Sequence, residues 1–232
     1  MATPRSKAGT KGVPRALREE QILAAATEEF GEHGYAGASL AAVAARVGVT
    51  KTLLHQYFGT KQDLHLACLT PVGDRLVAAM SEAVAEDGAT APGTPLRVLR
   101  AIFNALEGRR EAWFVLYDAS LPTDGESARR AARYRASVDR LAEGGTADLL
   151  RAAGSADPLD ADALNHVWQG LVATLVRWWI KHPDQSPDAM ARRCARLFAV
   201  GAALASDGTD RGVPTAGAGG GAGGGASAPR VP

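Results

Sequence analysis

The side chains best suited to chemistry in this chain lie in residues 51–58. If these residues form a helix, Lys51, Thr52 and Gln56 face outward, where they can hydrogen-bond to phosphates or to the edges of DNA bases. Gln56 suits adenine, and Leu53 suits the methyl group of thymine. The composition of this short face is therefore typical of a helix that enters a DNA groove.

Two short helices joined by a tight turn are predicted to position these side chains. Ser39 can cap the first helix and Thr50 the second, because each hydroxyl accepts from a free amide of a first helical turn. Gly48 lies between them, where glycine alone reaches a positive φ without steric cost. Leu54 then packs inward, and the pattern predicts a helix-turn-helix. A helical hairpin with a purely structural role is the alternative.

Further contacts are expected with DNA phosphates rather than with bases. Ser39, His55, Tyr57 and Lys61 are placed for them, and Lys61 would act together with the amides at the start of the next helix. Thr50 is included in the expected interface because it begins the second helix.

An amphipathic helix precedes this unit and completes a recognisable pattern. The residues are Ile22-Leu-x-Ala25-Ala26-x3-Phe30-x-Glu32-x-Gly34-Tyr35-x3-Ser39, then Gly48-Val49-Thr50-Lys51, then Tyr57-Phe58-x2-Lys61. With them the chain resembles the TetR family of transcriptional regulators over residues 15–65. The resemblance implies a sequence-specific, dimeric repressor that a small-molecule ligand releases from its operator. Leu53 and His55 depart from the family's usual hydroxyl and phenol, which implies a different operator.

Composition and charge agree with a small DNA-binding unit on a larger body. The chain has 232 residues, 46% of them apolar, and a net charge of +1, whereas residues 1–62 hold eight basic and five acidic residues. No alternating strand pattern occurs, so the predicted fold is all-α. A non-specific architectural DNA-binding protein is the alternative function, but it would be expected to carry far more positive charge.

An enzyme is the less favoured alternative. The five histidines have no metal-ligand spacing, and no glycine-rich phosphate loop follows a strand, so neither a metal nor a cofactor is predicted. Cys68 and Cys194 lie far apart and suggest no disulfide framework. No apolar run approaches the roughly 20 residues of a membrane span, and we expect a cytoplasmic protein without a membrane partner.

The chain is expected to divide into four segments. These are a disordered basic arm (1–14), a three-helix helix-turn-helix domain (15–60), a helical effector-binding and dimerisation domain (61–205) and a disordered Gly/Ala-rich tail (206–232). Pro71 is expected to kink or restart the helix that begins at Lys61. A helix over 109–121 is expected further along.

Two residue sets in the body carry functional predictions. A wide apolar arc on residues 160–181 and a stripe on the last helix suggest a four-helix dimer interface, with burial inside the monomer as the alternative. Its residues are Val167, Leu171, Leu175, Cys194, Leu197, Phe198 and Gly201. The family resemblance also implies a pocket for a small-molecule effector, although core packing explains each aromatic residue equally well. Its residues are Phe103, Asn104, Trp113, Phe114, Tyr117, Tyr134 and Trp168.

Overall fold

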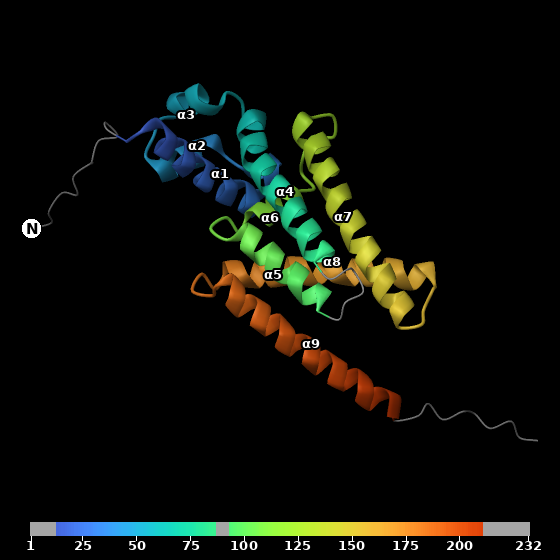
Figure 1. The fold of residues 1–232 in the computed structure, drawn as a ribbon. Coiled ribbons are helices and arrows are strands. Elements are labelled where there is room, and N and C mark those ends of the chain that lie inside the picture. Colours follow the sequence, from blue (N-terminus) through green and yellow to red (C-terminus); the bar gives the residue numbers. More distant parts are fainter. Residues whose placement is uncertain (1–12, 87–92, 211–232) are drawn as a thin grey trace, which may run out of the picture. The chain divides into compact units, whose positions relative to one another are not determined.

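A computed structural model of the protein describes residues 13–86 and 93–210, except for the side chains of residues 202 and 204–210. Every regular element in these residues is a helix, which confirms the predicted all-α fold (Figure 1). The helices are α1 (Arg15–Gly37), α2 (Leu40–Val47), α3 (Lys51–Phe58), α4 (Lys61–Ala85), α5 (Thr94–Leu106), α6 (Ala112–Leu116), α7 (Glu126–Ala152), α8 (Pro158–Ile180) and α9 (Pro187–Asp210).

The chain divides into two compact units, and the boundary in the sequence lies between Ala195 and Arg196. In the first unit α1 packs against α2, α4 and α6, while α4 also packs against α5 and α7, and α7 against α8 (Figure 1). The described part of the second unit is the C-terminal part of α9. The predicted arm lies outside the described residues apart from Val13 and Pro14.

The last helix is longer than expected. α9 continues to Asp210, whereas the disordered tail was expected to begin at Ser206. Serine and glycine are weak helix formers but do not forbid a helix, and Pro214 is the first following residue that does. The rest of the predicted tail lies outside the described residues.

Helix α4 runs without interruption through Pro71, so the helix does not restart there as predicted. Proline inside a helix costs about 3 kcal/mol, because it removes one backbone hydrogen bond and crowds the preceding turn. Apolar side chains on both sides of Pro71 are buried, among them Leu64, Cys68, Val72 and Leu76. Burial of this continuous face outweighs the local cost.

The helix expected over 109–121 is limited to the single turn and a half of α6. The chain after α6 instead binds the C-terminal end of α1. The Asp118 carboxylate accepts from the backbone amide of Tyr35, and the Ser120 hydroxyl accepts from that of Ala36 at 3.0 Å. These two hydrogen bonds fix the end of α1 against the body.

Helices α1 and α6 approach closely because Gly31 has no side chain. A Cβ atom at this position would lie 2.6 Å from the Cβ of Glu111 and 2.7 Å from its carbonyl oxygen. Any larger residue therefore requires a shift of the α6 backbone. The helix that supports α2 and α3 is thus in direct contact with the body.

Candidate nucleic-acid interface

Both helices of the predicted DNA-binding unit begin at the predicted caps. The Ser39 hydroxyl accepts from the amide of Ala42 at 3.4 Å, and the Thr50 hydroxyl accepts from that of Leu53 at 3.1 Å. Each cap occupies one amide that the first helical turn would otherwise leave unpaired. The starts of α2 and α3 are therefore determined by local sequence.

The turn between α2 and α3 depends on Gly48. This residue adopts φ +74° and ψ +32°, a left-handed conformation that disfavours any residue with a Cβ. The amides of Gly48 and Val49 donate to the carbonyls of Ala45 and Ala44 at 3.2 and 2.9 Å. This pair of hydrogen bonds closes α2 and directs the chain into α3.

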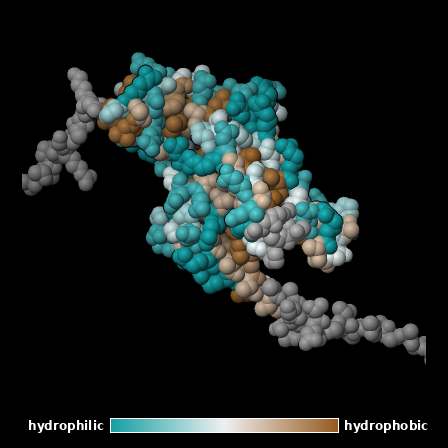
Figure 2. Space-filling view, in the orientation of Figure 1, coloured by the Kyte–Doolittle hydropathy of each residue, from teal (hydrophilic) through white to brown (hydrophobic). Residues whose placement is uncertain are grey.

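Helix α3 has one buried anchor and a polar outer face. Leu54 is fully buried, whereas Leu53 and Tyr57 are partly buried. In the view of Figure 2, hydrophilic residues lie on the surface over α3. The exposed side chains include four that were predicted to meet DNA, namely Lys51, Thr52, His55 and Gln56.

Lys61 is used within the protein itself. Its ammonium donates to the carbonyl of Ala38 at 2.6 Å and lies 5.0 Å from the centre of the Tyr35 ring. The side chain therefore ties the start of α4 to the link between α1 and α2. Since an ammonium has three N–H donors, two remain for a phosphate.

His55 is constrained by the end of its own helix. Its Nδ1 lies 2.6 Å from the carbonyl oxygen of Gly59, and a carbonyl can only accept, so Nδ1 carries a proton. A neutral His55 then presents only a lone pair at Nε2. It can accept from a base amino group, but it can donate to a phosphate only when the ring is protonated.

Glu29 and Arg15 also support this interface, although the sequence analysis did not select them. Glu29 is almost fully buried, and its carboxylate accepts from the amide of Ser39 at 2.9 Å. The Arg15 guanidinium lies 5.2 Å from the centre of the Tyr57 ring. An acidic residue on the buried side of an amphipathic helix is the signal that could have identified Glu29.

The predicted effector residues do not form one site. Trp113, Phe114 and Tyr117 line a hollow of about 290 Å³ between α6 and α8, together with Gln169 and Arg177. The Trp113 and Tyr117 rings stack with centres 4.7 Å apart. Among the described residues, the Tyr117 hydroxyl has no hydrogen-bond partner, and burial raises its pKa, so it remains a donor at neutral pH.

The other four predicted effector residues lie elsewhere. Phe103 is fully buried against Trp179, Asn104 is exposed, and the Tyr134 hydroxyl is hydrogen-bonded to α4. Trp168 lines a smaller apolar hollow of about 50 Å³ between α4, α5, α7 and α8. Helical spacing placed these residues inward but could not determine which neighbours they share.

The predicted interface residues differ in exposure. Val167 is 66% exposed on α8, and Leu171 and Leu175 are partly buried. Cys194 is fully buried within its own chain, so it offers no surface to a partner. Leu197, Phe198 and Gly201 belong to the second unit.

In the part of the chain that the structure describes, no group of three His, Cys, Asp or Glu side chains could hold a metal ion. Burial raises the pKa of Cys68 to about 12, which leaves its thiol unreactive at neutral pH. Within the same residues, each helix is too short or too polar to cross a membrane.

Comparison with known proteins identifies the helix-turn-helix. The family described as "Bacterial regulatory proteins, tetR family" matches residues 22–68, from α1 into α4. The transcriptional activator FasR of Mycolicibacterium smegmatis is 29% identical over 174 residues, which cover 73% of this chain and 75% of FasR. Residues 22–68 form a DNA-binding domain of the TetR family. With this domain and these relatives, the chain is a DNA-binding transcriptional regulator and not an enzyme.

Solved structures of TetR-like regulators share the fold. A TetR-family regulator from Bordetella parapertussis has a TM-score of 0.64 at 21% identity, over 80% of this chain and 95% of that one. FadR from Bacillus subtilis, solved with stearoyl-CoA, has a TM-score of 0.53 at 20% identity, over 77% of this chain and 96% of FadR. The similarity therefore extends through the helical body.

Proposed function

We propose that this TetR-family regulator is a homodimer that binds a double-stranded operator through α3 and represses transcription until a small molecule releases it. The polar outer face of α3 carries the proposal. Lys51, Thr52 and Gln56 are exposed on a helix that is capped at its start and anchored by the buried Leu54. Such a helix can lie in the major groove with its first turn against the base edges.

Dimerisation is proposed because one short helix contacts too few bases for useful specificity. Along α8, Val167, Gly170, Leu171, Thr174 and Trp178 lie on one stripe, and all five are exposed or partly buried. Their spacing of three and four residues gives a continuous face of low polarity. Pairing this face with the same face of a second copy would begin a four-helix bundle about a two-fold axis.

The hollow beside α6 is the effector site that we propose. The Trp113 and Tyr117 rings offer an apolar wall, and the Arg177 guanidinium lies 5.0 Å from the centre of the Phe114 ring. A ligand with a flat or chain-like apolar body and an acceptor oxygen would satisfy the Tyr117 hydroxyl. Stearoyl-CoA, which is bound in FadR, combines the same two properties in a larger molecule.

The contact between α6 and α1 would carry the signal. Tyr117 and the loop residue Asp118 are adjacent, and Asp118 accepts from the Tyr35 amide at the end of α1. Gly31 of α1 lies against Glu111 at the start of α6. A ligand that binds a displaced α6 more tightly would therefore shift α1, and with it the distance between the two copies of α3.

Binding to specific DNA tests the proposed function directly. The full chain is titrated with DNA from upstream of its own gene and with a scrambled fragment, at two salt concentrations. We expect a preference for the upstream DNA that persists at the higher salt concentration. Equal, strongly salt-dependent binding of both fragments would instead support an architectural protein. Benzoate and stearoyl-CoA are then added to the complex to test whether either one releases the protein from the DNA.

Replacing side chains of α3 should separate affinity from specificity. Lys51→Ala is expected to weaken operator binding about tenfold and to reduce the salt dependence, because a phosphate contact is lost. Gln56→Ala should relax the preference at one base pair. Fluorescence anisotropy with operator variants measures both effects. Lys181→Ala, an exposed lysine at the end of α8, is the matched control, and an equal loss in this variant would contradict the assignment.

Gly31→Ala should weaken operator binding about tenfold even without effector, because the added Cβ displaces α6 from α1. Gly37→Ala, in the same helix, is the control, since its Cβ would meet only the His33 Cβ at an ordinary 3.5 Å. Anisotropy measurements on both variants check this result. Equal operator affinities of the Gly31→Ala and Gly37→Ala variants would mean that the contact between α1 and α6 does not affect DNA binding.

Repression is proposed because a dimer bound at a promoter is sufficient to exclude the polymerase. We also propose that the protein acts in the cytoplasm, where its operator DNA would be. FasR, however, is described as an activator. A reporter fused to the upstream DNA is compared with and without the regulator. Higher expression without it supports repression, and lower expression would identify activation.

A further inference from the structure

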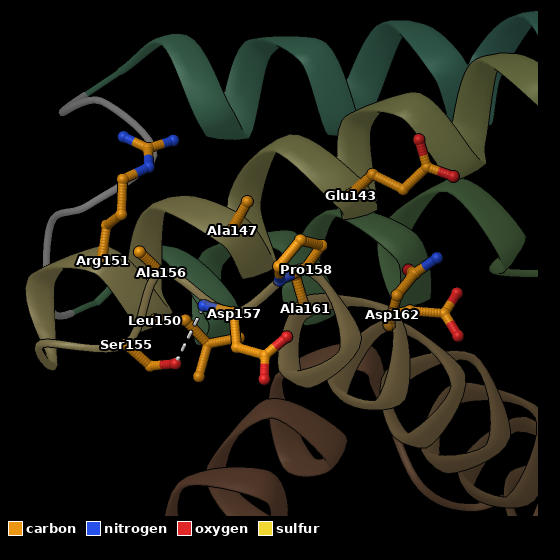
Figure 3. Close-up of a pocket in the computed structure, with 11 residues that line it drawn as sticks. Glu143, Ala147, Leu150, Arg151, Ser155, Ala156, Asp157, Pro158, Ala161 and Asp162 are labelled. Carbon is orange, nitrogen blue, oxygen red and sulfur yellow. Dashed lines mark hydrogen bonds between the residues drawn. The ribbon is translucent and has the colours of Figure 1, made fainter.

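A second hollow, of about 400 Å³, lies where the end of α7 meets the start of α8 (Figure 3). Apolar side chains form much of its wall, among them Ala147, Leu150, Pro158 and Ala161. It is separate from the hollow beside α6, which is lined by α8 residues 169–177. Nothing in the proposed regulation by an effector uses it.

A buried polar side chain, that of Asn165, lines this hollow. Asn165 of α8 is 95% buried, and among the described residues its side-chain oxygen finds no hydrogen-bond donor. An acceptor left unpaired in the interior costs free energy that a donor from a ligand would recover. A ligand with an N–H or O–H group at this position would therefore donate a hydrogen bond to the Asn165 oxygen.

The charges around the hollow indicate the sign of that ligand. Glu143, Asp157 and Asp162 line it with three carboxylates, against a single guanidinium from Arg151. The Arg151 side chain extends away from Asp157 and Asp162 (Figure 3) and is paired with Asp148. Asp157 caps α8 by accepting from the amide of Leu159, and Asp162 lies 3.6 Å from the His166 ring. Among the described residues no lysine or arginine is paired with any of the three carboxylates, which favours a positively charged ligand.

We propose that this hollow binds an organic cation with N–H donors, a primary ammonium or guanidinium carried on a short apolar chain. The ammonium donates to the side-chain oxygen of Asn165 and lies among the carboxylates of Glu143 and Asp162. The apolar chain covers the wall formed by Leu150 and Pro158. A site of this kind selects for hydrogen-bond donors as well as for charge.

Two matched probes test the proposal on the full chain by isothermal titration calorimetry. Hexylammonium carries three N–H donors, and hexyltrimethylammonium carries the same charge and chain without any. We expect saturable binding of hexylammonium and at least tenfold weaker binding of hexyltrimethylammonium. Equal affinities, or no saturable heat with hexylammonium up to about 10 mM, would overturn the proposal.

Substitutions locate the binding. Asn165→Leu should weaken hexylammonium binding at least tenfold, whereas Asn165→Asp should strengthen it several-fold because a carboxylate replaces the neutral acceptor. The two variants are expected to change the hexylammonium affinity in opposite directions, so the other variant still tests the proposal if one of them folds poorly. Glu143→Gln with Asp162→Asn should also weaken binding, while Glu20→Gln on α1 should not. Unchanged affinity in both Asn165 variants would refute the site, and operator binding is measured separately on each.

Discussion

Arg110→Ala is expected to lower the free energy of unfolding by about 2–4 kcal/mol. The guanidinium of Arg110, between α5 and α6, donates four hydrogen bonds to backbone carbonyls where α8 ends and the chain turns toward α9. Its acceptors are Trp179 at 2.8 Å, His182 at 3.1 Å, Pro183 at 3.1 Å and Gln185 at 2.9 Å. It also lies 4.0 Å from the centre of the Trp179 ring.

The size of this effect follows from the loss of four charge-assisted hydrogen bonds and one contact with a ring. Only the Trp179 carbonyl belongs to α8, and the carbonyls of Trp179, His182 and Gln185 each keep a second donor without Arg110. Arg110→Lys should restore less than half of the loss, because one ammonium cannot reproduce the planar fork of five donors. Because α8 carries the proposed dimer face, Arg110 also positions that surface.

Urea unfolding followed by circular dichroism at fixed protein concentration measures the change. Arg100→Ala is the control, since Arg100 is mostly exposed and, among the described residues, pairs only with the exposed Asp188 at 3.5 Å. It should cost less than about 1 kcal/mol. A loss for Arg110→Ala no larger than that of the control would show that the four hydrogen bonds contribute little.

His65 should make the protein lose up to about 3 kcal/mol of stability as the pH falls from 6.5 to 4. Burial is the main reason that its pKa is lowered from 6.5 to about 4, with a smaller lowering from Lys61 and an opposing effect of Asp118. Between these values the unfolded chain binds a proton that the folded chain does not. Acid therefore favours unfolding over this range, and the effect is complete below pH 4.

The surroundings of His65 explain this behaviour. It is fully buried on α4, with ring centres 5.0 Å from Phe30 and 5.3 Å from Tyr35 of α1. Within the described residues neither ring nitrogen has a hydrogen-bond partner, so no hydrogen bond stabilises a positive charge, and the charge of Asp118 offsets the burial only in part. The position joins α1 to α4, so protonation would loosen the DNA-binding helices from the body.

Replacing the imidazole by a ring that cannot titrate isolates this contribution. His65→Phe keeps an aromatic ring against Phe30 and Tyr35 and should flatten the pH dependence of the unfolding free energy relative to the wild type. His166→Gln, whose side chain is 73% exposed in the wild type, should leave it unchanged. If the unfolding free energy of His65→Phe changes with pH in parallel with that of the wild type, His65 is not the titrating group.

Local sequence was sufficient for the predicted DNA-binding face. Ser39, Thr50 and Gly48 act within four residues of their own positions, so caps and turn follow from residue type alone. The inward position of Leu54 follows from helical periodicity. The buried carboxylate of Glu29 was missed because its partner, the Ser39 amide, lies ten residues away and the pairing depends on how α1 crosses α2.

What the sequence by itself determined is the family, the all-α fold and the outer face of α3, since these depend on caps, spacing and one left-handed glycine. Only the tertiary structure decided that α4 continues through Pro71, because its burial on several helices exceeds the local cost of proline. It also separated Trp113 from Trp168, which the family resemblance had suggested as parts of one pocket. Periodicity tells which side of a helix is buried, whereas the neighbour on that side depends on contacts between distant segments.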